Sequence, residues 1–222
     1  MTVDLKPTTK QKLLVVLIEQ LMPRMENPIF LTDYFMSCLD EGGAISLLGL
    51  QGIFNLIQKH NINYPNIYNK LYSLLAADIF STTYKARFFY LSDIFLTSTH
   101  LPEAMVAGFV KKLARLSLMA PPGDIIMMMA FIKNLIIRHP GLKKMLRHSP
   151  GQDVKTDPYI FEEADPSKSR AIDSSLWEVQ LLQHHVLPGV AASAMFISKP
   201  LSPTETDLGD LLEVTTEEVS PK

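Results

Sequence analysis

The sequence contains little cysteine and little glycine for its length. Cys38 is the only cysteine among 222 residues, so an internal disulfide and a cysteine-based zinc site are both excluded, and a reducing compartment is indicated. Ten glycines exclude collagen-like and glycine-rich low-complexity classes. With 47% hydrophobic and 20% charged residues, the composition is that of a folded chain long enough to bury a sizeable core.

Long uninterrupted apolar runs are also missing. The ranges 42–58 and 116–137 are the most apolar, and a hydropathy scan is expected to flag them. Glycines and polar residues around Gln51 interrupt the first, and residues 121–124 (PPGD) interrupt the second. A membrane-spanning helix needs about 20 consecutive apolar residues. Both ranges are therefore interpreted as buried core helices, and membrane association is not expected.

Motifs for catalysis and cofactor binding are missing as well. The sequence has no G-x-S-x-G, no G-x-G-x-x-G, no P-loop lysine motif and no H-E-x-x-H. His184 and His185 are adjacent, so their rings point to different faces of a helix and do not suggest a metal site. Cys38 lies in an apolar segment and is predicted to be a buried structural thiol. The sequence therefore predicts a non-enzyme with no catalytic residues, no metal, no other cofactor and no small-molecule substrate.

Helix signals dominate what is present. Apolar residues recur at helical spacing between proline and glycine breaks, which predicts antiparallel helices with short connections. The predicted fold class is all-α, an array of HEAT or armadillo type, with a compact helical bundle as the competing architecture. Composition divides the chain into a helical array (1–148), an extended loop followed by C-terminal helices that pack on the array (149–198), and an acidic tail expected to be mobile (199–222).

The extended loop and the helix after it have distinct signals. The segment 149–167 contains three prolines and no apolar period, and it is expected to lie along the helices through Tyr159. Asp165 and Pro166 have the types preferred at the cap and first position of a helix. They predict a helix that runs to about Val186.

Charge is distributed unevenly along the chain. The net charge is −2, but residues 104–148 carry eight Lys and Arg against one acid (+7), and residues 149–222 carry five against thirteen (−8). Such a basic block, residues 104–148, attracts phosphate backbones or acidic protein surfaces. The same imbalance is compatible with a solvated charged face, and with an acidic C-terminal segment that folds back over the block. The candidate RNA or partner contacts are Lys111, Lys112, Arg115, Lys133, Arg138, Lys143, Lys144 and Arg147. The head groups of the first three are expected to be solvent-exposed, because they lie off the apolar stripe of their helix.

Two stretches of the sequence resemble a known family. The first runs from His60-Asn61 through the tyrosine-rich segment after Pro65 to Ala120-Pro121-Pro122, and the second covers Asp157 to Glu178. Together they resemble the CCAAT-binding-factor-like domain of the nucleolar complex proteins, over roughly residues 44–212. The motif positions, expected to be structural, are Tyr64, Pro65, Tyr84, Arg87, Phe88, His100, Pro102, Asp157, Pro158, Asp165, Pro166 and Trp177.

The resemblance implies a factor of the nucleus and nucleolus that acts in ribosome biogenesis. It implies a helical repeat protein that serves as a protein-binding scaffold in the small-subunit processome. The implied role is in rRNA processing for the small ribosomal subunit. The implied partners are a protein of the nucleolar protein fourteen type and other processome proteins. The alternative is a helical repeat that binds pre-rRNA directly through the basic block. Family proteins are longer, so the chain is expected to match their C-terminal part.

Overall fold

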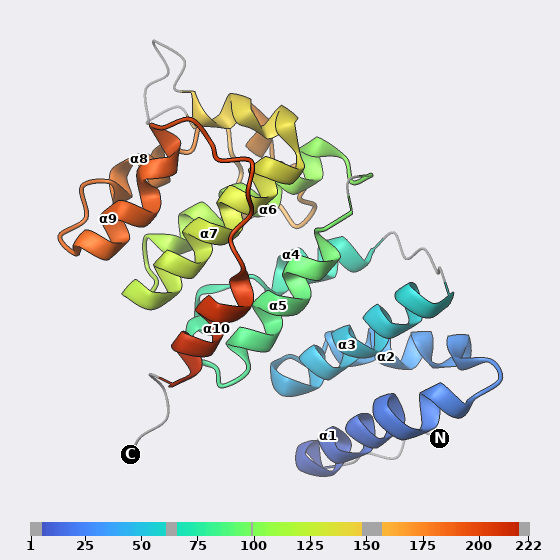
Figure 1. The fold of residues 1–222 in the computed structure, drawn as a ribbon. Helices are drawn as coiled ribbons and strands as arrows, with labels where there is room; N and C mark the ends of the chain where they lie inside the picture. Colours follow the sequence, from blue (N-terminus) through green and yellow to red (C-terminus); the bar gives the residue numbers. More distant parts are fainter. Residues whose placement is uncertain (1–5, 61–65, 99, 148–156, 218–222) are drawn as a thin grey trace. The chain divides into compact units, whose positions relative to one another are not determined.

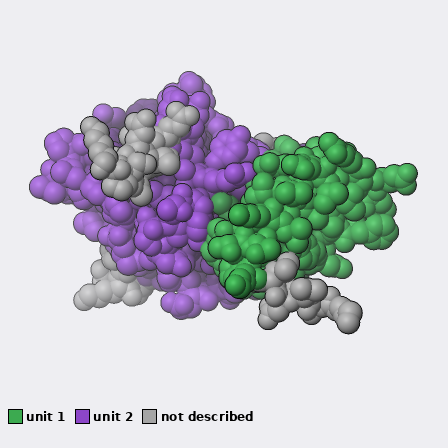
Figure 2. All heavy atoms as spheres, turned by 90° about the horizontal axis from the view of Figure 1, so that it is seen from below, with its two compact units in different colours: residues 1–67 green, residues 68–222 purple. Residues whose placement is uncertain are grey.

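The computed structural model describes residues 6–60, 66–98, 100–147 and 157–217, and within these ranges the regular elements are all helical (Figure 1). The predicted all-α class is confirmed, and the HEAT or armadillo repeat type stays a prediction. The chain divides into two compact units, residues 1–67 and 68–222, which Figure 2 distinguishes by colour. This division differs from the compositional boundaries at 148 and 198, because the C-terminal segments pack onto earlier helices of the second unit.

The first unit is built on three α-helices. They are α1 (Pro7–Val16), which continues through Leu17–Leu21 and Met22–Arg24 as π and 3-10 turns, α2 (Thr32–Leu39) and α3 (Gly43–His60). α2 packs against α3. The approach is close at Gly52, where an added Cβ would lie 2.6 Å from the ring of Phe35. Cys38 is fully buried beside this contact, as predicted for a structural thiol, and burial raises its pKa.

The second unit is organised around two long helices, α6 (Glu103–Ser117) and α7 (Pro122–Arg138), which pack against each other. The unit also contains α4 (Ile67–Leu74), α5 (Lys85–Phe95), a 3-10 helix (Pro140–Leu146), α8 (Trp177–Leu182), α9 (Pro188–Ala194) and α10 (Leu208–Glu217). Every residue of α6 from Val106 to Ala114 is buried. A helix that is buried all round is a core helix rather than an amphipathic surface helix.

The predicted helix from Pro166 to Val186 is wrong. Turns, bends and a short 3-10 helix (Ala171–Asp173) replace it until Trp177, where α8 begins, and Val186 is 88% exposed. Arg170 has a φ of 57°, a left-handed conformation that an α-helix does not accommodate. Pro166 packs so closely on α6 that a Cβ added to Gly108 would lie 2.7 Å from its Cβ. Tertiary packing on α6 therefore overrides the local helix-start signal.

Residues 199–207, the C-terminal strap, attach to α7 and lead into α10. The side-chain amide of Asn134 on α7 donates to the backbone oxygen of Thr206 (2.7 Å), and the backbone N–H of Thr206 donates to Oδ1 of Asn134 (2.9 Å). α10 then packs against α5 and α7, with Leu208 and Leu212 each only 5% exposed. Thr206, Leu208 and Leu212, which belong to the range expected to be a mobile tail, thus contact the core of the second unit, and the mobility of the tail stays a prediction.

None of the helices among the described residues combines the length and apolarity needed to cross a membrane. The two apolar ranges contribute to the core instead. Leu50 and Ile53 of α3 are fully buried, and so are Ile132 and Leu135 of α7. Their interpretation as core helices is confirmed.

Candidate functional site

The basic block is divided between the interior and the surface of the second unit. Lys111 is fully buried, Lys112 is 9% exposed, and the side chain of Arg115 is 30% exposed. The prediction of solvent-exposed head groups for these three residues is therefore wrong. The physical reason is that residues 157–178 cover the face of α6 that carries them.

Lys111 and Arg115 pair with Asp157 and Glu178, and these four side chains form the buried charge cluster. Lys111 Nζ lies 2.8 Å from each carboxylate oxygen of Glu178 and 3.1 Å from Asp157 Oδ2. Arg115 Nη2 lies 2.6 Å from Asp157 Oδ2. Two positive and two negative side chains balance, as buried ions must to offset their desolvation.

Asp157 is the centre of this cluster. Ser174 Oγ donates to Oδ1 (2.5 Å), and so does the backbone N–H of Tyr159 (3.1 Å), while the indole N–H of Trp177 donates to Oδ2 (2.9 Å). Burial raises the pKa of Asp157, but the hydrogen bonds from Ser174 and Trp177 and the charge of Lys111 outweigh burial and hold the pKa well below its usual range. Trp177, a motif position expected to be structural, is thus a hydrogen-bond donor to the cluster.

Glu178 is the most deeply buried acid of the cluster. Burial raises its pKa, and the charge of Lys111 and its hydrogen bond oppose that rise. Arg115 Nε approaches Glu178 Oε1 to 2.5 Å, but the angle does not satisfy a hydrogen bond, so the approach is a charge contact. The guanidinium also lies over the Trp177 ring, with Cζ 4.7 Å from the ring centroid.

Lys112 is stabilised differently, by aromatic rings rather than by a carboxylate. Its Nζ lies 4.0 Å from the Tyr72 ring centroid and 5.9 Å from that of Phe161, and it donates to the Tyr72 carbonyl (2.8 Å). The Tyr72 hydroxyl in turn hydrogen-bonds to that of Tyr159 (2.8 Å), which confirms that the loop packs on the array through Tyr159. Burial lowers the pKa of Lys112 to about 8, although Glu162 raises it slightly.

A pH-dependent stability difference should follow from Lys112. Its folded pKa of about 8 lies below its ordinary value of 10.5, so between these values the folded chain binds fewer protons than the unfolded chain. The free energy of unfolding of wild type, relative to that of Lys112→Met, should therefore rise from pH 8 towards 10.5 by at most about 1.4 kcal/mol per pH unit. Urea denaturation of both proteins across this range measures the difference. Parallel stability curves would mean that the ammonium is not desolvated.

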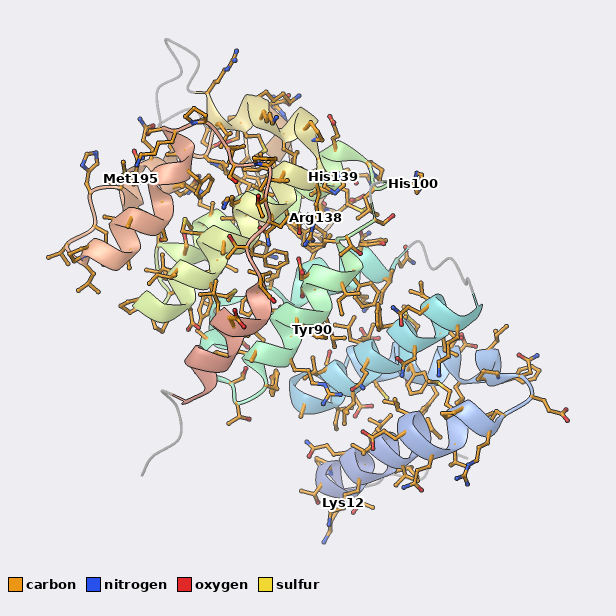
Figure 3. All side chains as sticks on the ribbon, viewed as in Figure 1. Lys12, Tyr90, His100, Arg138, His139 and Met195 are labelled. Atoms are coloured by element: carbon orange, nitrogen blue, oxygen red, sulfur yellow. The ribbon has the colours of Figure 1, made fainter. Side chains whose placement is uncertain are left out.

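Arg138 at the end of α7 joins the strap to the core (Figure 3). Arg138 Nη1 lies 2.7 Å from Asp93 Oδ1, and its Nη2 lies 2.6 Å from Glu205 Oε2. Lys133, five residues earlier, donates only a long hydrogen bond of 3.4 Å to Thr206. Together with the buried charge cluster, these pairs support the hypothesis that the acidic C-terminal segment folds back over the basic block.

Three members of the basic block stay at the surface. Lys143, Lys144 and Arg147 are exposed in and just after the 3-10 helix that follows α7. Among the described residues none of the three forms an ion pair. They are exposed members of the block that an external anion can reach.

The other motif positions have mixed surroundings. Tyr64 and Pro65 lie outside the described residues. Phe88 is buried against Phe89, with ring centroids 5.5 Å apart, and Tyr84 and Pro102 precede α5 and α6 at their N-caps. Arg87 and His100 are exposed, whereas Pro158 and Asp165 are partly buried in the turns before α8.

Sequence reasoning did not identify the acidic partners of Lys111 and Arg115. The charge imbalance between residues 104–148 and 149–222 indicates that the two segments attract each other, but it does not identify which basic residue pairs with which acid. Within the part of the chain that the structure describes, no three or more His, Cys, Asp or Glu side chains are arranged to hold a metal ion.

Comparison with known proteins gives a consistent set of relatives. The model of the CBF/Mak21 family matches residues 46–194. Nucleolar complex protein 4 homolog A of Xenopus laevis is 49% identical over 212 residues, which covers 96% of this chain and 40% of the relative. The nucleolar complex protein 4 homologs of Danio rerio and Homo sapiens are 48% and 44% identical, over 94% of this chain and 40% of each relative. The chain thus spans about 40% of the length of these curated relatives.

Proposed function

The chain belongs to the CBF/Mak21 family, and from that premise we propose that it acts in ribosome biogenesis in the nucleolus of the cell nucleus. The observation that carries this proposal is the similarity to proteins named as nucleolar complex protein 4 homologs along almost the whole chain. The family match includes α6, α7 and residues 157–178, which cover one face of α6.

The proposed role is that of a non-catalytic scaffold in the small-subunit processome, during maturation of small-subunit rRNA. Its partners would be a protein of the nucleolar protein fourteen type and other processome proteins. A core in which Lys111 and Arg115 are neutralised from within favours a rigid helical support over a reactive site. Rigid helical arrays present large surfaces to protein partners.

Purification of the tagged chain from cells tests this proposal. Recovery of small-subunit processome proteins together with small-subunit rRNA precursors is the expected result. Recovery of neither, with a diffuse cytoplasmic signal in microscopy, would contradict the proposal for this chain.

Direct binding of pre-rRNA is the second candidate function, and the exposed Lys143, Lys144 and Arg147 favour it. Replacing all three with alanine should leave the thermal midpoint nearly unchanged, because exposed charges contribute little to stability. If they contact phosphates, the variant should bind RNA more weakly. The negative slope of log affinity against log salt should also become shallower, by about 2–3 units. Fluorescence anisotropy with a single-stranded RNA at several salt concentrations measures both quantities. An unchanged slope would exclude this triad from RNA binding.

A further inference from the structure

We infer that the hollow between α7, α9 and the C-terminal strap is a binding site for an acidic peptide segment with an apolar anchor residue. The inference deepens the proposed function and rests on it, because it names the chemistry of a partner that the scaffold would hold. It concerns the second unit alone.

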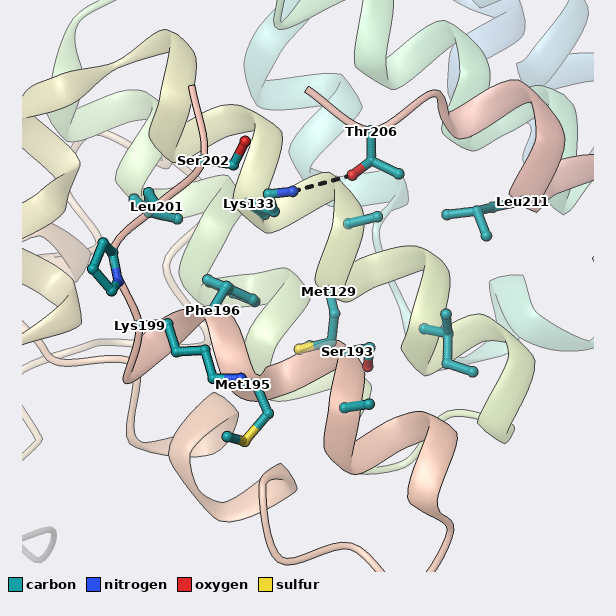
Figure 4. A pocket seen from close by; sticks show the side chains of 14 residues that line it. Met129, Lys133, Ser193, Met195, Phe196, Lys199, Leu201, Ser202, Thr206 and Leu211 are labelled. Carbon is teal, nitrogen blue, oxygen red and sulfur yellow. Dashed lines mark hydrogen bonds between the residues drawn. The ribbon is translucent and has the colours of Figure 1, made fainter. Parts of the chain in front are cut away.

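The hollow has a volume of about 460 Å³, which is within the range of ligand-binding pockets, and its walls come from separate segments of the chain (Figure 4). Met129 of α7 lies on one side and Phe196, just after α9, on another. Leu211 of α10 also lines it. Such flexible and aromatic apolar groups accept a large hydrophobic side chain without a strict shape requirement.

Two lysines give the hollow its charge. Lys133 of α7 and Lys199 of the strap both line it, and Lys133 is only half-buried while Lys199 is exposed. Among the described residues, neither forms an ion pair with a carboxylate. By contrast, Lys111, Arg115 and Arg138 are each paired with acids of the chain itself. The hollow therefore retains unneutralised positive charge beside apolar surface.

The chain already binds a segment of the matching chemistry on the neighbouring surface of α7. Glu205 of the strap pairs with Arg138, and Leu208 and Leu212 bury their side chains a few residues later. Lys133 lies five positions before Arg138, on the same side of α7 as the strap, because it contacts Thr206. A second acidic–apolar segment would repeat this arrangement, with a carboxylate at Lys133 and Lys199 and an apolar side chain over Met195 and Phe196, which line the hollow and are half-buried.

A peptide suits the hollow better than single-stranded RNA does. Proteins that bind single strands use several aromatic rings on which successive bases stack. Among the described residues that line the hollow, Phe196 is the only aromatic one, and the rest of the apolar wall is aliphatic or thioether. A peptide uses both features of the site, because its carboxylates complement the lysine charges and its apolar anchor residue is buried against the apolar wall.

Fluorescence anisotropy on the purified chain tests the inference. The probe is a short fluorescein-labelled peptide that alternates aspartate and leucine around one phenylalanine. The double variant Lys133→Glu/Lys199→Glu should weaken its binding by about tenfold or more, since two attractive contacts become repulsive. Ala192→Trp, which fills the hollow from an exposed position on α9, should weaken binding without a charge change.

The matched control is Lys6→Glu/Lys12→Glu, which makes the same charge change on exposed lysines at the start of the first unit, outside the hollow, and should leave binding unchanged. A peptide with lysine in place of aspartate should not bind. Equal binding of the acidic probe by all variants, or no binding to the wild type, would overturn the inference. So would a uridine-rich RNA that competes for the site and is lost in the same double variant. Because these measurements use the purified chain, retained peptide binding without recovery of processome proteins from cells would overturn the proposed function alone.

Discussion

Lys111→Met should lower the free energy of unfolding by about 3–5 kcal/mol, the cost typical of removing one partner from a buried ion pair. Lys111 is fully buried and contacts both carboxylates of the buried charge cluster. Without it, Arg115 alone must balance Asp157 and Glu178. Since burial already raises the pKa of Glu178, we expect this acid to take up a proton in the variant. Urea denaturation followed by circular dichroism measures the loss.

A second substitution separates charge imbalance from loss of packing. In Lys111→Met/Glu178→Met, the remaining ions are Arg115 and Asp157, which pair at 2.6 Å, so most of the lost stability should return. Lys168→Met is the surface control: its ion pair with Asp165 is 3.4 Å long and the lysine side chain is 75% exposed, so a change within about 0.5 kcal/mol is expected. A single Lys111→Met variant as stable as the control would show that the cluster is not buried as described.

Gly108→Ala should destabilise the protein by about 1–3 kcal/mol, although alanine is the better helix former by about 1 kcal/mol. A Cβ at this position in α6 would lie 2.7 Å from both Cβ and the backbone oxygen of Pro166. Backbone cannot move aside as a flexible side chain can, so the turns around Pro166 must separate from α6. Thermal unfolding, together with faster amide hydrogen exchange in residues 157–176, reports this separation.

Gly189→Ala is the matched control for that substitution. Gly189 lies in α9, and a Cβ there would be 3.6 Å from Ile126 Cδ1, which is ordinary van der Waals contact. Its thermal midpoint should stay the same or rise slightly, as helix propensity predicts. If the thermal midpoints of both glycine variants rise, the contact between Gly108 and Pro166 is looser than the structure indicates.

The sequence predicted the helices that local signals define. α6 begins directly after Pro102, and α7 begins in the 121–124 break and ends before Pro140, because proline and glycine are strong local signals for helix ends. The prediction of a helix after Pro166 is wrong because tertiary packing determines the conformation there. Its sequence favours a helix start, but the left-handed Arg170 and the contact with Gly108 belong to the packed state and leave no periodic trace.

The positions of the α6 lysines could not be predicted for a similar reason. The apolar stripe of α6 through Phe109, Leu113 and Leu116 correctly identifies one buried face. The spacing of apolar residues in α6 cannot predict that the opposite face of the helix is also buried, because residues 157–178 and Tyr72 cover that face. Lysine at such a position is rare unless it is paired, and the pairing acids lie far away in sequence. The opposite charges of the two halves of the second unit were the only sequence-level indication.

The long sequence separation within the buried charge cluster sets an order for folding during synthesis. Lys111 and Glu178 are 67 residues apart, so α6 cannot neutralise its interior lysine until the chain has been made past Glu178. The helices in residues 6–60 contact one another across much shorter sequence separations, so this part of the chain can fold earlier on the ribosome. A chain that ended near residue 148 would keep Lys111, Arg115 and Tyr72 without their covering segments, and would expose the centre of the second unit to aggregation or to chaperones.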